Sequence, residues 1–271
     1  MNESLDVSAP VEPQEIEELL RAVRLTKVNG DFYRERAKKF EEVVHFITHL
    51  LVVMRDLKRR KQAVLLDCGT GRSYLSFVAN MVLSQKAGRD VHFIGVDSDE
   101  RLIQSCRSVQ ETLGYDNMEF HASDILSFQP ERTPDIVYSL HACDTATDEM
   151  IAKGIQLQAR FILTAPCCQH ELHDRLRGGH CLKDLTKFSV FKDKVCVLLT
   201  DGIRALALEA AGYRVKVIEF VAPTATPKNV MLRAERMRWT RDSEALESYR
   251  RVKETFRFTP AVERMLPGFF E

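Results

Sequence analysis

A short turn at residues 67–71 is the first place where the chain gathers residue types suited to chemistry. An apolar run over residues 63–66 ends in Asp67, and Gly69 and Gly71 follow before a helix-like pattern begins at Ser73. An apolar run that ends at glycine is typical of a buried strand, and glycine lets a ligand approach the main chain. In open α/β sheets ligands bind beyond the carboxyl ends of strands, so this turn is a candidate ligand site. A plain strand–turn–helix that binds nothing is the alternative.

The spacing in this turn is Asp-x-Gly-x-Gly. It differs from the dinucleotide fingerprint G-x-G-x-x-G/A, because Tyr74 stands where the third small residue is required. The pattern resembles motif I of the class I S-adenosylmethionine-dependent methyltransferases. That resemblance implies that Gly69 and Gly71 pass close to the methionine part of the cofactor. It also implies that Asp67 orients the loop or meets the cofactor's ammonium group, directly or through water.

Further acids follow the next two predicted strands. Asp97 ends the strand over residues 91–97, where a carboxylate can accept hydrogen bonds from both ribose hydroxyls of a nucleoside. The alternative is a helix cap, a role for which Asp99 is better placed. Asp124 follows the strand over residues 118–121, and the methyltransferase resemblance implies that it accepts from an adenine amino group; otherwise it is a loop acid. The predicted cofactor-binding set is Asp67, Gly69, Gly71, Asp97, Ser98, Ser123, Asp124 and His141.

Two segments after the fourth and fifth predicted strands are more distinctive. Residues 141–148 read His-Ala-Cys-Asp-Thr-Ala-Thr-Asp, and residues 166–170 read Pro-Cys-Cys-Gln-His. They resemble the His-x-Cys-Gly/Asp-x-Ala-Thr-Asp and Pro-Cys-Cys-x-His segments of methyltransferase domain family 32. This branch includes methyltransferase-like protein 25 and, more distantly, tRNA 2′-O-methyltransferases with a Cys-Cys-His-His segment. A later Asp-Gly-Ile-Arg run at residues 201–204 is similar to the family's distal signature.

Three mechanisms would use these segments, and the predicted catalytic residues are His141, Asp144, Cys167, Cys168 and His170. In the first, they form the floor of a methyl-acceptor pocket, since transfer from a sulfonium needs little beyond in-line positioning. In the second, His141 or His170 is a general base for a hydroxyl acceptor. In the third, a cysteine thiolate attacks a nucleobase. The alternative is that both adjacent thiols are buried packing groups.

A metal site is the competing interpretation of the cysteines and histidines at residues 167–181. Zinc takes these ligands, but structural zinc sites favour C-x₂₋₄-C spacing, and adjacent cysteines seldom both reach one ion. We therefore expect no metal.

The remaining pattern predicts an α/β fold. Apolar strand-like runs alternate with helical periodicity from residue 63 to residue 234, which indicates a Rossmann-like, mostly parallel seven-stranded sheet with an antiparallel last strand. Residues 166–192 look looser. We expect a disordered tail at residues 1–13, an N-terminal helical segment at 14–61, the methyltransferase domain at 62–235 and an extension at 236–271.

The composition of the chain bears on its cellular compartment and on its partners. The chain has 271 residues, of which 39 are basic and 39 acidic, so no global field directs it to nucleic acid. Seven unpatterned cysteines favour reduced thiols in a cytoplasmic protein, and we expect neither a secretory signal nor a membrane span. Local basic clusters at residues 55–61 and 233–241 fit RNA phosphates or, alternatively, a solvated helical face. RNA is the leading acceptor class, by family analogy. A small molecule or protein acceptor, and an inactive binding module, are the alternatives; oligomeric state stays open.

Overall fold

The computed structural model describes residues 16–27, 33–57, 62–142, 144–167, 170–176, 179–222, 229–237 and 242–270. The described residues form two compact units. Unit 1 lies within Met1–Ser123 and Glu219–Asn229, and unit 2 lies within Asp124–Ile218 and Val230–Glu271. The strands follow the order β3-β2-β1-β4-β5-β7-β6 in a seven-stranded sheet, which confirms the predicted mixed, Rossmann-like fold.

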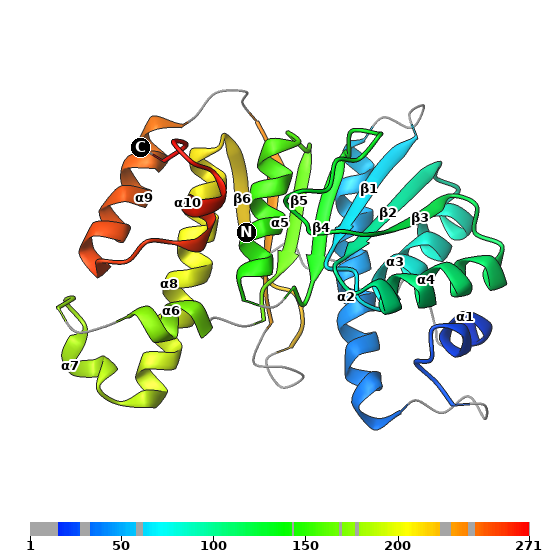
Figure 1. The fold of residues 1–271 in the computed structure, drawn as a ribbon, viewed down its shortest axis with the longest axis horizontal. Coiled ribbons are helices and arrows are strands. Elements are labelled where there is room, and N and C mark those ends of the chain that lie inside the picture. Colours follow the sequence, from blue (N-terminus) through cyan, green and yellow to red (C-terminus); the bar gives the residue numbers. More distant parts are fainter. Residues whose placement is uncertain are drawn as a thin grey trace. The chain divides into compact units, whose positions relative to one another are not determined.

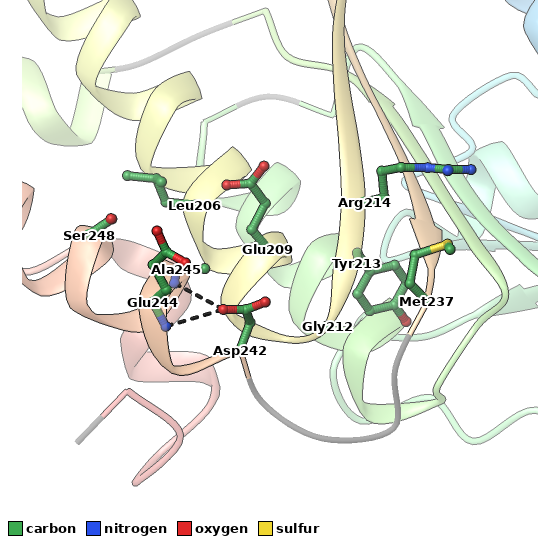
Figure 2. A pocket seen from close by; sticks show the side chains of 10 residues that line it. All are labelled: Leu206, Glu209, Gly212, Tyr213, Arg214, Met237, Asp242, Glu244, Ala245 and Ser248. Atoms are coloured by element: carbon green, nitrogen blue, oxygen red, sulfur yellow. Dashed lines mark hydrogen bonds between the residues drawn. The ribbon is translucent and has the colours of Figure 1, made fainter.

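Unit 1 is built on three parallel strands. Strand β1 pairs with β2, and β2 pairs with β3, each in parallel. Every residue of β1 is buried, because its apolar run is covered on both faces, as parallel sheets require. Helices α3 and α4 follow β1 and β2, as the alternating pattern predicts (Figure 1). The elements are β1 (Ala63–Cys68), α3 (Tyr74–Asn80), the π-helical turn η2 (Met81–Lys86), β2 (Val91–Asp97), α4 (Glu100–Leu113) and β3 (Met118–Ala122).

The N-terminal segment of unit 1 is helical, as predicted. Helix α1 (Glu17–Ala22) is short, and α2 (Arg34–Asp56) is long. Phe46 and Ile47 on α2 are fully buried, and Phe46 packs edge-on against Phe220 at a ring separation of 6.5 Å. The apolar periodicity of this segment therefore marks a true core face.

Unit 2 carries the other four strands. Strand β4 pairs in parallel with β5, and β7 runs antiparallel to β5, as predicted. A side chain at Gly154 on α5 would collide with Ile162 and touch Val137, so this helix packs closely on the β4–β5 face. The strands and their main helices are β4 (Ile136–Leu140), α5 (Thr145–Gln156), β5 (Phe161–Ala165), α8 (Ser189–Ala210), β6 (Tyr213–Glu219) and β7 (Val230–Arg236).

Two parts of unit 2 differ from the sequence expectation or extend it. The segment that looked loose contains α6 (His170–Arg175) and α7 (Lys183–Thr186), and α8 begins within it at Ser189. The first turns of α8 carry exposed apolar side chains, which hides the helical period. After β7 come α9 (Ser243–Phe256) and α10 (Ala261–Met265).

None of the helices within the described ranges is long and apolar enough to cross a bilayer. The predicted tail at residues 1–13 lies outside the described residues. The predicted domain boundaries stay predictions.

Candidate active site

The turn after β1 adopts a conformation that most side chains resist. Gly69 and Gly71 have φ angles of +71° and +56°, in the left-handed region that glycine enters without strain. A Cβ built on Gly71 meets no atom within 4 Å, so its main chain faces open space. The amides of Gly69 and Thr70 both donate to the carbonyl of Val96 at the end of β2. The turn is thus hydrogen-bonded to the end of β2, and it is open to solvent at Gly71.

Asp67 holds this turn from inside. It is 4% exposed, and its Oδ2 accepts hydrogen bonds from Thr70 Oγ1 at 2.7 Å and Ser76 Oγ at 2.5 Å. Burial raises the pKa of the Asp67 carboxyl from 3.8 to about 6, and the two hydroxyl donors offset part of that rise. Of the two predicted roles for Asp67, orienting the loop is visible in these contacts; a contact with the cofactor stays a prediction.

Asp97 joins the turn after β1 to the end of β2. Its Oδ2 accepts from the amide of Gly71 at 2.8 Å, and its Oδ1 accepts from the amide of Asp99 at 3.0 Å. Asp99, not Asp97, caps helix α4 by accepting from the amide of Arg101, as predicted. The half-buried Asp97 carboxylate keeps lone pairs beyond those two bonds, as hydroxyl donors of a ribose require.

The other predicted cofactor residues lie in different surroundings. Ser98 is exposed, and the amide of Ser123 donates to the carbonyl of Asp97 at 3.0 Å. Both residues lie in unit 1, as the turn does. Asp124 begins unit 2, where its Oδ1 accepts from the amides of Leu126 and Ser127. Its side chain therefore also has a local structural role.

These residues of unit 1 fit a nucleoside cofactor that carries an amino acid. The open face at Gly71 admits a ligand to the main chain, and the Asp97 carboxylate lies at the same turn. Cys106 also contacts the turn, because its thiol donates to the carbonyl of Gly71 at 3.4 Å. Burial raises the pKa of that thiol to about 12, so Cys106 is not a thiolate near neutral pH.

The segment after β4 carries backbone strain. His141 and Asp144 have φ angles of +66° and +52°, unusual values for residues other than glycine. Thr147 Oγ1 donates to the carbonyl of Ala142 at 2.6 Å and closes the loop onto the start of α5. Two strained residues within four positions are a mark of a functional loop.

The segment after β5 lies beside it within unit 2. Cys167 is half-buried, and His170 is the exposed first residue of α6. Asp144 Oδ1 accepts from the amide of Glu171 at 3.1 Å, so Asp144 ties the loop after β4 to the helix that follows β5. Glu171 Oε1 also pairs with Arg264 at 2.5 Å. Cys168 and Gln169 lie outside the described residues, as does Cys143.

The structure contains a buried ion network that the sequence motifs did not predict. Arg204 on α8 is 1% exposed and contacts Asp148 in a bidentate pair, with Nε–Oδ1 at 3.2 Å and Nη2–Oδ2 at 2.5 Å. Its Nη1 also lies 3.3 Å from Asp201 Oδ1. Burial acts to lower the pKa of Arg204, but the two carboxylates outweigh it and the net pKa is raised. The available signal was the acid and arginine of the Asp-Gly-Ile-Arg run, three positions apart and therefore on one helix face.

The structure brings together Asp144 and the start of α6, one residue from His170, within unit 2. The predicted convergence of His141, Asp144, Cys167, Cys168 and His170 around a methyl group stays a prediction. Among described residues, no group of three or more His, Cys, Asp or Glu side chains could hold a metal ion, and the expectation of no metal also stays a prediction.

Comparisons with known proteins agree with the fold. The model of methyltransferase domain family 32, described as a methyltransferase domain, matches residues 38–175. A human glutathione S-transferase C-terminal domain-containing protein is 26% identical over 161 residues, covering 51% of this chain and 25% of that protein. The chain therefore spans about a quarter of the length of the curated relatives it matches.

Solved structures are similar at low identity. Magnesium protoporphyrin IX methyltransferase from Synechocystis with bound SAH is 18% identical, with a TM-score of 0.46 over 83% of this chain and 94% of that one. An rRNA methylase from Streptococcus thermophilus is 12% identical, with a TM-score of 0.42 over 65% of this chain and 88% of that one.

The family model covers half of the chain, including the turn after β1 and the segments after β4 and β5. The chain contains a methyltransferase domain over the matched residues, as the Asp-x-Gly-x-Gly turn predicted. It belongs to methyltransferase domain family 32.

Proposed function

We propose that this chain transfers the methyl group of S-adenosylmethionine to RNA of the tRNA or rRNA class. The finer assignment, to the branch with methyltransferase-like protein 25 and the Cys-Cys-His-His tRNA 2′-O-methyltransferases, is part of this proposal. It is supported by the segments at residues 141–148 and 166–170. The observation that carries the RNA acceptor is an exposed aromatic and basic surface on α7 and α8.

We assign binding of the methyl donor to residues of unit 1. The main chain at Gly69 and Gly71 would lie against the methionine part of the cofactor, and Asp97 would accept from its ribose hydroxyls. When bound, the cofactor supplies a methyl group activated by the sulfonium charge. The contribution of this chain is to hold that group in line with an acceptor and to keep the turn rigid through Asp67.

We assign binding of the methyl acceptor to the strained loop after β4 and to the start of α6. His141 and His170 are the side chains that could take a proton from a hydroxyl acceptor, and Asp144 fixes the backbone between the two segments. In-line positioning in a pocket formed by these segments ranks first, a histidine base second and attack by Cys167 or Cys168 third. All three keep these residues in the acceptor pocket.

The RNA acceptor is supported by what we name the Phe188 patch. Phe188 and Phe191 are 54% and 50% exposed, with their rings edge-to-face at 6.0 Å, and Lys187 Nζ lies 5.2 Å from the Phe188 ring centre. Exposed aromatics stack on unpaired bases at about 1–3 kcal/mol per base, and neighbouring lysines attract phosphate. The patch consists of Lys183, Leu185, Lys187, Phe188, Val190, Phe191, Lys192 and Lys194.

Charge at the Phe188 patch favours a polyanion. Four lysines share residues 183–194 with only Asp184 and Asp193, and Asp193 lies 3.2 Å from His173. The patch is therefore positive although the whole chain is neutral.

Label transfer tests the proposal. The protein is incubated with methyl-labelled S-adenosylmethionine and a lysate from a strain lacking its gene, and label is measured in RNA, protein and small molecules. We expect label in RNA, reduced about tenfold or more by a Phe188→Ala, Phe191→Ala double variant. Leu198→Ala removes an exposed apolar side chain of α8 outside the patch and serves as the matched control.

Label in protein or small molecules, with none in RNA, would refute the RNA acceptor. Absence of label from all fractions would favour an inactive binding module. Lys187→Glu should weaken RNA binding and reduce its salt dependence, whereas Lys216→Glu on β6 should have less effect.

A further inference from the structure

Arg204 is surrounded by acceptors from two segments of unit 2. Its guanidinium makes the bidentate pair with Asp148 on α5 and the contact with Asp201 on α8, and its Nη2 also donates to the main-chain carbonyl of Asp144 at 2.8 Å. Arg204 and Asp148 are 1% and 3% exposed. Three donor nitrogens of one side chain are thus engaged away from solvent.

A buried ion network of this kind usually adds little to the folding stability of a protein. Taking an arginine and two carboxylates out of water costs several kcal/mol per ion, and apolar replacements often leave a protein as stable or more so. A buried guanidinium instead fixes geometry. Its planar group holds the hydrogen-bond acceptors that it contacts in one relative arrangement. The groups in question here are the start of α5 and the carbonyl of Asp144.

The carbonyl of Asp144 belongs to a residue in a strained conformation, with φ at +52°. A conformation of this kind is strained and persists only where surrounding contacts hold it. Arg204 supplies one such contact, and the Asp144 carboxylate then accepts from the amide of Glu171. A continuous chain of hydrogen bonds therefore runs from α8 through the loop after β4 to the first turn of α6.

We propose that Arg204 is a positioning residue for methyl transfer, which holds the loop after β4 and the start of α6 in one arrangement through Asp144. This inference rests on the proposed function, because those two segments carry the predicted acceptor residues. Arg204 contacts none of His141, Cys167 or His170 in any hydrogen bond of the described structure, so it acts through the backbone of Asp144.

The alternative is an ion network that only stabilises unit 2. The two differ in what a conservative variant does. Lysine in place of Arg204 keeps the charge but has no fork, so it cannot pair with Asp148 in a bidentate manner and reach the Asp144 carbonyl together. A network that needs only charge would tolerate lysine, whereas a positioning role would not.

The experiment compares Arg204→Met, Arg204→Lys and Asp201→Asn with the wild-type chain. Arg160→Met is the matched control, because Arg160 pairs with Glu235 at 2.6 Å in the same unit. Two quantities are measured on each protein: hydrogen exchange of the backbone amides at residues 170–176, and steady-state methylation of total small RNA from the deletion strain. Thermal unfolding reports whether each variant folds.

We expect Arg204→Met to raise amide exchange at residues 170–176 about tenfold or more and to lower kcat about 10- to 100-fold. KM for S-adenosylmethionine should stay within about twofold, because the turn at Gly69 and Gly71 belongs to unit 1. Arg204→Lys should recover little of either loss. Asp201→Asn, which leaves the contacts of Arg204 with Asp148 and Asp144, should show a smaller change. Arg204→Lys replaces Arg204→Met if Arg204→Met fails to fold.

Normal exchange and normal kcat in folded Arg204→Met or Arg204→Lys would overturn the inference. If the wild-type chain labels no RNA, the proposed acceptor is wrong, but the exchange measurements still decide whether Arg204 holds the start of α6.

Discussion

The Asp67 carboxyl makes the stability of this protein depend on pH in an unusual direction. Burial raises its pKa from 3.8 to about 6, so the folded chain retains a proton over a pH range in which the unfolded chain has lost it. Folding is therefore favoured at low pH by this group, and that contribution is lost as pH rises from about 4 to above 6. The usual aspartate, with a lowered pKa, behaves oppositely.

The expected magnitude follows from the two pKa values. The rise from 3.8 to about 6 corresponds to about 3 kcal/mol in the free energy of unfolding once the carboxyl is ionised in both states. About 1.3 kcal/mol of this is lost between pH 5 and pH 7, and almost none above pH 7.5. Asp67 is 4% exposed, so solvent screening reduces the figure little.

The substitution Asp67→Asn tests this reasoning. The amide oxygen can still accept from Thr70 and Ser76, but it carries no charge at any pH. We expect the free energy of unfolding of Asp67→Asn, minus that of the wild-type chain, to grow by about 1.3 kcal/mol from pH 5 to pH 7.

Urea unfolding at half-unit pH steps from 5 to 8 measures this difference. Asp116→Asn, at an exposed position of unit 1, is the control for loss of one acidic group. A difference between Asp67→Asn and wild type that stays constant from pH 5 to pH 7 would show that ionising Asp67 costs nothing. Burial would then not raise the pKa of Asp67 in the folded chain.

Four further expectations concern the turn after β1, a buried hydroxyl group on β5 and the cysteines. Asp97→Ala removes the acceptor of the Gly71 amide and should weaken S-adenosylhomocysteine binding about tenfold or more by calorimetry; equal affinity would remove Asp97 from the cofactor site. Gly69→Trp, at a φ of +71°, should abolish that binding, and unchanged affinity in a folded variant would remove the cofactor assignment from this turn. Thr164→Val should be neutral or stabilising by denaturant unfolding, because the fully buried Thr164 hydroxyl has no hydrogen-bond partner among described residues; a loss above about 1 kcal/mol would contradict this. Elemental analysis of chelator-free protein should find no metal, and a stoichiometric zinc content would mean that the cysteines are ligands.

Much of the fold was predictable because its signals are local. The run that becomes β1 is apolar over consecutive residues, and Asp99 stands one position before α4, where a cap is required. Gly212, with a φ of +86°, follows the end of α8, as a glycine after a helix predicts. Each of these signals lies within a few residues of the structure it specifies, so it can be read without knowing what packs against it.

The candidate site was predictable in residue type but not in arrangement. The glycines of the turn, the acids after β2 and the histidines and cysteines after β4 and β5 are evident in the sequence. That Asp67 is buried with a raised pKa, and that Asp144 bonds to the amide of Glu171, depend on segments far apart in the chain.

The burial of Arg204 is the clearest example of a feature that the sequence alone does not predict. In the sequence Arg204 lies 56 positions from Asp148, and although Asp201 stands three positions before it, nothing local shows that its side chain is buried. Only the packing of α8 and α5 within unit 2 removes water from both side chains and turns a surface residue type into a buried contact. Sequence determines which groups are available and which elements carry them; tertiary structure decides which charges lose their water, because desolvation depends on every element packed around a side chain.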